Sequence, residues 1–210
     1  MRNKIVILML VVLLCCGGLS QAAPITISIT GNVTSAGGSA LPSTIHVGDI
    51  FTGTYTYDGE AINTSTYSNI GKYMCDSPCG IRIFLNGFEF KTDPTQGRLG
   101  IDIWNDVTSN GTNDSYYVHS GLTAYTNGLW IGDISWNLND STHTAISSVD
   151  LPVTTPVLSA WNYNYLHING GDRGFGYVDF YIGGIVTRVT PEPFTGILLA
   201  MGAFFLRRKR

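Results

Sequence analysis

The central part of the chain alternates apolar and polar residues with a period of two, which is the pattern of half-buried strands. Isoleucine alternates with threonine and serine over residues 25–30, and residues 50–57 continue the pattern up to an Asp-Gly turn. Residues 81–85 and 88–90 flank Asn86-Gly87, which predicts a hairpin with a type I′ turn. Further strands are expected at 99–104, 115–125, 129–138, 160–168 and 174–189. About nine strands exceed what one flat sheet usually holds. The pattern therefore predicts an all-β domain, a two-sheet antiparallel sandwich resembling a jelly roll.

The first 22 residues have the three zones of an export signal. Arg2 and Lys4 precede an unbroken apolar run over residues 5–14, and Ser20-Gln21-Ala22 supplies small residues at a cleavage site. A permanent N-terminal anchor is the alternative, but the run is short for a span of about 20 residues. We therefore expect a signal peptide at 1–22 and a β domain at 23–189.

The C-terminal segment, residues 190–210, has an equally distinct order of parts. A Pro191-Glu192-Pro193 triplet is followed by an apolar stretch over 194–206 and then by four basic residues, Arg207, Arg208, Lys209 and Arg210. The apolar stretch predicts a short transmembrane helix, and the basic stop predicts that the extreme C-terminus stays on the cytoplasmic side. A plain C-terminal membrane anchor is the alternative.

This triplet, apolar helix and basic cluster resemble the PEP-CTERM sorting signal of exosortase substrates in bacteria with abundant exopolysaccharide. The resemblance implies an exosortase-like partner that cuts near Pro191-Glu192-Pro193 and removes the tail. It also implies export across the inner membrane, transient anchorage through the C-terminal helix, and a final place in the cell envelope, on the cell surface or in the biofilm matrix. A looser resemblance to the opening of such proteins covers residues 31–35 and 47–58.

The net charge of the central segment excludes some classes of binding partner. The segment from Asp49 to Glu192 contains all fifteen acidic residues and six basic ones, a net charge of −9. Such a surface, without a basic stripe, argues against nucleic acid and anionic lipid as partners.

Only two cysteines remain once an export signal is removed. Cys75 and Cys79 are separated by three residues. In an oxidising compartment such a pair predicts a structural disulfide. Metal binding and free thiols are the alternatives.

One polar loop carries a partial calcium pattern. Asp106, Thr108, Asn110 and Asp114 occupy positions 1, 3, 5 and 9 of a twelve-residue calcium loop, and Gly111 occupies position 6. Position 12 is Tyr117 instead of glutamate, and the flanks read as strands. We expect no cofactor, with calcium at this loop as the alternative to a solvated turn.

An aromatic stripe marks the strand expected at 160–168. Trp161, Tyr163 and Tyr165 share one face with His167. These rings either fill the core or form an exposed platform on which sugar rings stack.

No catalytic motif was found, and the four histidines are scattered. The expected function is that of an exported, non-enzymatic cell-surface or exopolysaccharide-matrix protein. A carbohydrate-binding module is the alternative, and a secreted glycan hydrolase is less favoured because no carboxylate pair stands out.

Overall fold

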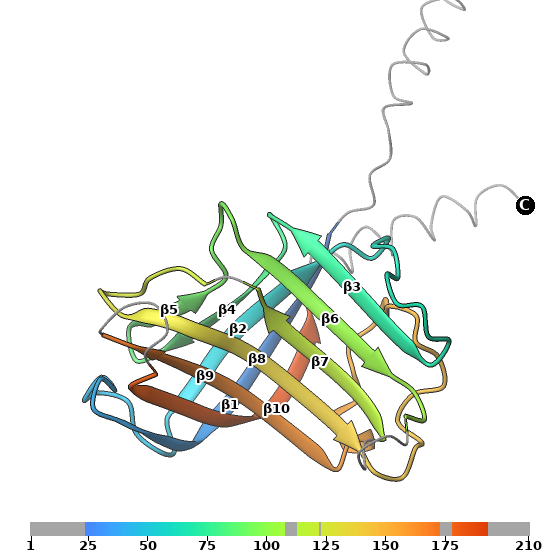
Figure 1. Cartoon of the computed structure of the whole chain (residues 1–210). Helices are drawn as coiled ribbons and strands as arrows, with labels where there is room; N and C mark the ends of the chain where they lie inside the picture. The colour runs from blue at the N-terminus through green and yellow to red at the C-terminus, as the bar shows by residue number, and fades with distance from the viewer. Residues whose placement is uncertain (1–23, 108–112, 122, 173–177, 193–210) are drawn as a thin grey trace, which may run out of the picture.

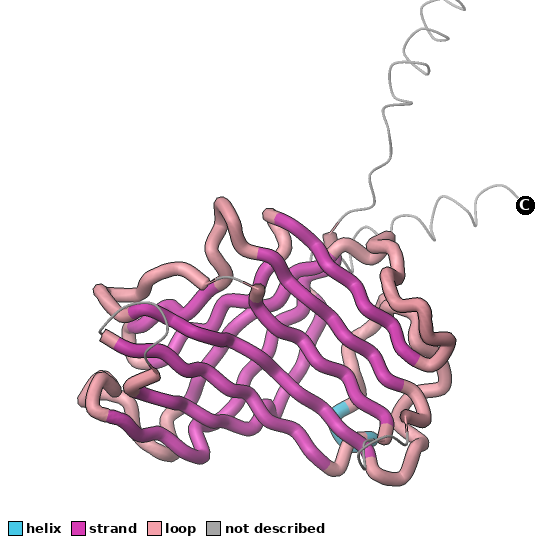
Figure 2. Tube along the Cα trace, viewed as in Figure 1, coloured by secondary structure: helices cyan, strands magenta, loops and turns pink. Residues whose placement is uncertain are grey.

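A computed structural model describes residues 24–107, 113–121, 123–172 and 178–192, and these residues form an all-β domain (Figure 1, Figure 2). The all-β class predicted from the sequence is thereby confirmed. The described residues form ten strands and one short 3-10 helix: β1 (Ile25–Gly38), β2 (Ile50–Tyr57), β3 (Ile70–Asp76), β4 (Gly80–Leu85), β5 (Phe88–Lys91), β6 (Arg98–Trp104), β7 (Asp114–Ser120), β8 (Trp130–Asp140), η2 (Leu158–Ala160), β9 (Tyr163–Gly171) and β10 (Phe180–Pro191).

The ten strands form a single antiparallel sheet in the order β3-β6-β7-β8-β9-β10-β1-β2-β4-β5. In Figure 1 this sheet curls, so that β6, β7 and β8 cross in front of β2 and β4. Strands β3 and β4 are far apart in the strand order, yet only residues 77–79 join them. The two ends of the sheet are therefore brought together at this connection.

The disulfide lies at the same connection. Cys75 near the end of β3 and Cys79 just before β4 are disulfide-bonded, with their Cα atoms 5.7 Å apart. The disulfide predicted from the sequence is thus seen, at the point where the sheet ends meet.

Long central strands explain why one sheet replaces the two that we expected. β1 has 14 residues and β10 has 12, and their pairing shifts register between Thr30 and Gly31 and between Val33 and Ser35. Such bulges bend a strand and increase its twist, so one strand can serve both halves of a curled sheet. The separate sheets of a jelly-roll-like sandwich are not seen among the described strands.

The core lies inside the curl and is built from alternate residues of every long strand. Ile27 and Ile29 of β1, for example, are almost fully buried, as the alternation at 25–30 predicts. At the centre, the rings of Tyr55 and Tyr116 pack on Trp136, with centroid distances of 5.9 Å and 6.4 Å. Strands β2, β7 and β8 thus share one core across the curl.

The two sequence signals at the chain ends lie mainly outside the described residues. This applies to the signal peptide predicted at 1–22, the helix predicted at 194–206 and the basic residues at 207–210. Among the residues that the structure describes, no helix has the length and apolar character needed to cross a membrane.

The last strand continues further than expected. β10 extends through Thr190 and Pro191, which pair with Ser28 and Ile27 of β1. β10 therefore ends two residues beyond the strand end expected at 189 and includes the first residue of the Pro191-Glu192-Pro193 triplet.

Candidate functional site

The outer face of the sheet carries the predicted aromatic stripe. Leu166 and Ile168 of β9 point into the core, so Tyr163, Tyr165 and His167 point outward by the alternation of the strand. Tyr163 is 47 % exposed, and the other two are half-buried. Trp161 precedes the strand and packs partly against the core. Of the two interpretations left open by the sequence, the core interpretation fits Trp161 and the exposed one fits the tyrosines.

The rings on β9 form a row along the strand. Tyr163 and Tyr165 have ring centroids 6.1 Å apart, and Tyr165 and His167 have centroids 6.3 Å apart. The Tyr165 ring lies directly over Gly183 of β10, where an added Cβ would be 1.8 Å from the tyrosine oxygen. Its hydroxyl also contacts the Ser35 hydroxyl at 3.1 Å. Gly183 therefore provides the space that lets Tyr165 lie against the sheet.

A second row of rings follows β7, which the sequence analysis did not single out. Tyr117 and His119 are stacked, with centroids 4.9 Å apart and an interplanar angle of 19°. The His119 ring covers Gly100 of β6, where an added Cβ would be 2.3 Å from Nε2. In each row, one ring thus packs on a glycine of the neighbouring strand, where any larger residue would collide with the ring.

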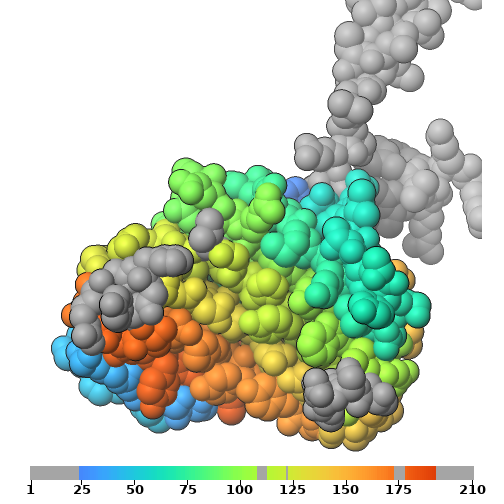
Figure 3. All heavy atoms as spheres, viewed as in Figure 1, coloured from blue at the N-terminus to red at the C-terminus, as the bar shows by residue number. Residues whose placement is uncertain are grey.

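Polar side chains of β8 separate the two rows. Ser135 and Asn137 pair in register with His167 and Tyr165 on one side, and with His119 and Tyr117 on the other. Neighbouring strands are about 4.8 Å apart, so the two rows are about 10 Å apart. We call this surface the outer aromatic face, and it comprises Tyr117, His119, Ser135, Asn137, Tyr163, Tyr165 and His167. Figure 3 draws all heavy atoms in the same view as Figure 1. The atoms of β6 to β9 form a continuous layer on the side of the sheet that faces the viewer.

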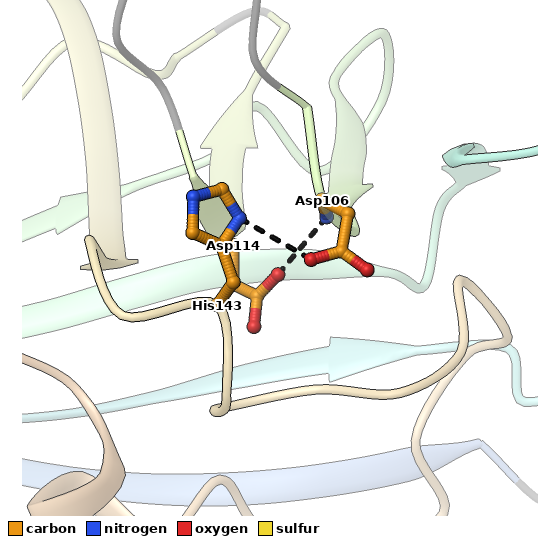
Figure 4. A group of neighbouring side chains, drawn as sticks. All are labelled: Asp106, Asp114 and His143. Atoms are coloured by element: carbon orange, nitrogen blue, oxygen red, sulfur yellow. Dashed lines mark hydrogen bonds and ion pairs between the residues drawn. The ribbon is translucent and has the colours of Figure 1, made fainter.

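A second cluster lies at one end of the sheet and includes two of the residues predicted for calcium. Asp106 follows β6, Asp114 begins β7, and His143 lies in the connection between β8 and β9. One ligand atom from each residue lies within 4.8 Å of the other two (Figure 4). Thr108 and Asn110 of the predicted calcium loop lie outside the described residues.

Hydrogen bonds fix the geometry of this cluster. The Asp114 carboxylate is fully buried and accepts the backbone N–H groups of Asp106 and Ile146, each at 3.1 Å. His143 Nδ1 lies 3.2 Å from Asp106 Oδ1. Sequence reasoning missed His143 because it is 29 residues beyond Asp114. The signal that finds it is the antiparallel pairing of β7 and β8, which places the residues after β8 beside the start of β7.

Asp140 organises the connection that carries His143. It pairs with Asp114 across β7 and β8, and its carboxylate accepts the backbone N–H groups of Thr142, Thr144 and Ala145. The N–H groups of Thr144 and Thr142, partly opposed by burial, hold the pKa of Asp140 at about 2, below its ordinary value of 3.8. The charged form of Asp140 therefore stabilises the turn on which His143 lies.

The described part of the Pro191-Glu192-Pro193 triplet contacts the first strand. The backbone N–H of Glu192 donates to Thr26 O at 3.1 Å, and the Ser28 hydroxyl donates to the Glu192 carboxylate. Pro191 is the last residue of β10, and Pro193 lies outside the described residues. Comparison with family models, with curated proteins and with solved structures finds no match to this chain.

Proposed function

We propose that this chain is an exported, non-enzymatic protein of the bacterial cell surface or exopolysaccharide matrix, and that its β domain binds polysaccharide on the outer aromatic face. The observation that carries the proposal is the pair of partly exposed aromatic rows, on β7 and β9, with the half-buried Asn137 amide between them. This proposal combines the two functions considered from the sequence: a matrix protein, and a domain that binds carbohydrate.

The chemistry of such a face suits a sugar polymer. The C–H faces of sugar rings stack on aromatic rings, and amide and hydroxyl groups bond to sugar hydroxyls. Tyrosine offers both a large apolar surface and a polar tip. The net charge of −9 between Asp49 and Glu192 disfavours a strongly anionic polymer by repulsion. We therefore assign a neutral or weakly charged polysaccharide as the ligand.

Binding without cleavage follows from the openness of the face. Tyr163 of this face exposes nearly half of its surface, and so does Tyr181 on the neighbouring strand β10. A hydrolase must position an acid and a base around a bond and control water at that bond. An open sheet surface supports adhesion to a polymer and leaves the glycosidic bonds intact.

Delivery by the two chain ends completes the proposal. The signal peptide directs export, and an exosortase-like enzyme removes the tail near Pro191-Glu192-Pro193. The contacts of Glu192 with Thr26 and Ser28 support a cleavage site at the very edge of the domain. The intact mass of protein from the native cell envelope tests this part. We expect a mass for residues 23 to about 193, two hydrogens light because of the disulfide, and a mass that retains residues 194–210 would contradict tail removal.

Retention on immobilised polysaccharide from the producing strain tests the binding activity. The protein should be retained without releasing reducing sugar. Tyr163→Ala should reduce retention, whereas Tyr67→Ala, at a tyrosine that is 68 % exposed and outside the face, should not. If both variants behave as the unmodified protein, the outer aromatic face is not the binding site. Release of reducing sugar would instead assign a hydrolase.

A further inference from the structure

Three segments that are separate in the sequence bring oxygen and nitrogen donors to one point at the end of the sheet. We propose that Asp106, Asp114 and His143 together bind one divalent transition-metal ion of the Zn²⁺ type. This site is distinct from the outer aromatic face and does not depend on polysaccharide binding. It also differs from the calcium loop that the sequence suggested, because its third donor is an imidazole from the β8–β9 connection.

The distances suit a small ion. Zinc binds histidine nitrogen at about 2.0–2.1 Å and carboxylate oxygen at about 2.0–2.2 Å, so neighbouring donors in a tetrahedral site are about 3.4 Å apart. His143 Nδ1 and Asp106 Oδ1 are 3.2 Å apart, and all three donor atoms lie within 4.8 Å of one another. Figure 4 shows the imidazole and both carboxylates directed toward the same space.

Burial and charge also favour a cation there. Asp114 is completely buried; its carboxylate accepts the backbone N–H groups of Asp106 and Ile146, and a carboxylate has roughly four lone-pair positions. Two carboxylates therefore meet beside one imidazole, which is neutral when it acts as a metal ligand. A divalent ion would balance these two negative charges. Asp106 is exposed, so water can complete the coordination.

The nitrogen donor decides the class of metal. Calcium and magnesium take oxygen ligands, whereas imidazole suits zinc, copper, nickel and iron. A metal held by these residues would join the β6–β7 connection to the β8–β9 connection. Because both connections extend from the same end of the sheet, the ion would cross-link them there. Binding to the folded state would raise the stability of the domain.

The test measures Zn²⁺ and Ca²⁺ binding by isothermal titration to the chelator-treated full-length chain. Asp106→Asn and His143→Asn are suitable variants, because both positions have positive φ, 53° and 61°, which asparagine tolerates. His46→Asn is the matched control, since His46 lies 3.9 Å from Asp49 without a second carboxylate in that ion pair.

We expect one Zn²⁺ per chain and weaker binding of Ca²⁺. Each site variant should lose at least about 10- to 100-fold in Zn²⁺ affinity, because a loss of that size is already seen when a residue that only hydrogen-bonds to a metal ligand is replaced. Co²⁺ should give the absorption bands of a four-coordinate ion, and these should disappear in His143→Asn. The proposal is overturned if Zn²⁺ does not bind, if Ca²⁺ binds more tightly, or if His46→Asn weakens Zn²⁺ as much as His143→Asn. Circular dichroism of each variant checks folding, and the two site variants provide independent tests.

Discussion

The hydroxyl pair of Tyr55 and Tyr116 gives a direct test of the curled sheet. These residues lie on β2 and β7, which have four strands between them in the sheet order, yet their hydroxyl oxygens are 3.3 Å apart. Both side chains are almost completely buried. Replacing either tyrosine with phenylalanine removes one hydroxyl and leaves the other buried without this partner.

The size of the effect follows from that burial. An unsatisfied buried hydroxyl costs about 1–3 kcal/mol, whereas replacing both partners by apolar groups of the same shape is nearly neutral. Tyr55→Phe and Tyr116→Phe should each lower the free energy of unfolding by about 1–3 kcal/mol. For a domain of this size, each kcal/mol corresponds to about 2–4 °C in Tm. The double variant should lose much less than the sum of the two single losses.

Equilibrium urea unfolding, followed by tryptophan fluorescence, measures this cycle. Trp136 packs on both tyrosine rings and reports on the same part of the core. Tyr125→Phe, at an exposed tyrosine, serves as the control and should change stability by less than about 0.5 kcal/mol. Strictly additive losses in the double variant would mean that the two hydroxyls do not meet and that β2 does not face β7.

Three further predictions concern stability. Asp140→Asn should destabilise the domain at neutral pH, and the unmodified protein should lose the Asp140 contribution as pH falls from about 3.8 toward 2, because folding lowers this pKa; acid unfolding of both forms checks this. Burial raises the pKa of Tyr57 from 10.0 to about 12, so stability should fall as pH rises from about 10 through 12, when the unfolded tyrosine ionises first; ultraviolet titration of the native protein should show its delayed ionisation. Reducing Cys75–Cys79 should cost no more than about 2 kcal/mol, because the closed loop is very small; thermal unfolding with and without reductant measures this.

Local signals in the sequence predicted the local structure well. Asn86-Gly87 between two apolar runs predicted a hairpin, and both residues have the positive φ, 47° and 84°, that a type I′ turn requires. Strand β3 was not predicted. Its inward positions include Gly71, and its outward Met74 is exposed, so its apolar pattern is weak. Pairing with β6 along seven residues forms this strand.

Long-range arrangement was the part that the sequence did not reveal. The number of strands suggested two sheets, because nothing local indicates that β1 and β10 bend at bulges and keep the sheet continuous. The same limit applied to the candidate sites. Asp106 and Asp114 were identified from one loop, but the partnership with His143 depends on how β7 and β8 pair. The stripe at Tyr163 and Tyr165 was identified, whereas its orientation depends on which face of β9 meets the core.

The central claim is that the two aromatic rows bind polysaccharide. Native electrophoresis through a gel containing polysaccharide from the producing strain measures it most directly, as a dissociation constant from the retardation at several polymer concentrations. If one ring contact contributes about 1 kcal/mol, as aromatic contacts do, its loss weakens binding about fivefold. Tyr117→Ala and Tyr163→Ala, one in each row, should each weaken binding by about this factor, and the Tyr67→Ala control should not. Equal retardation of all four proteins, or none for the unmodified protein, would contradict the account.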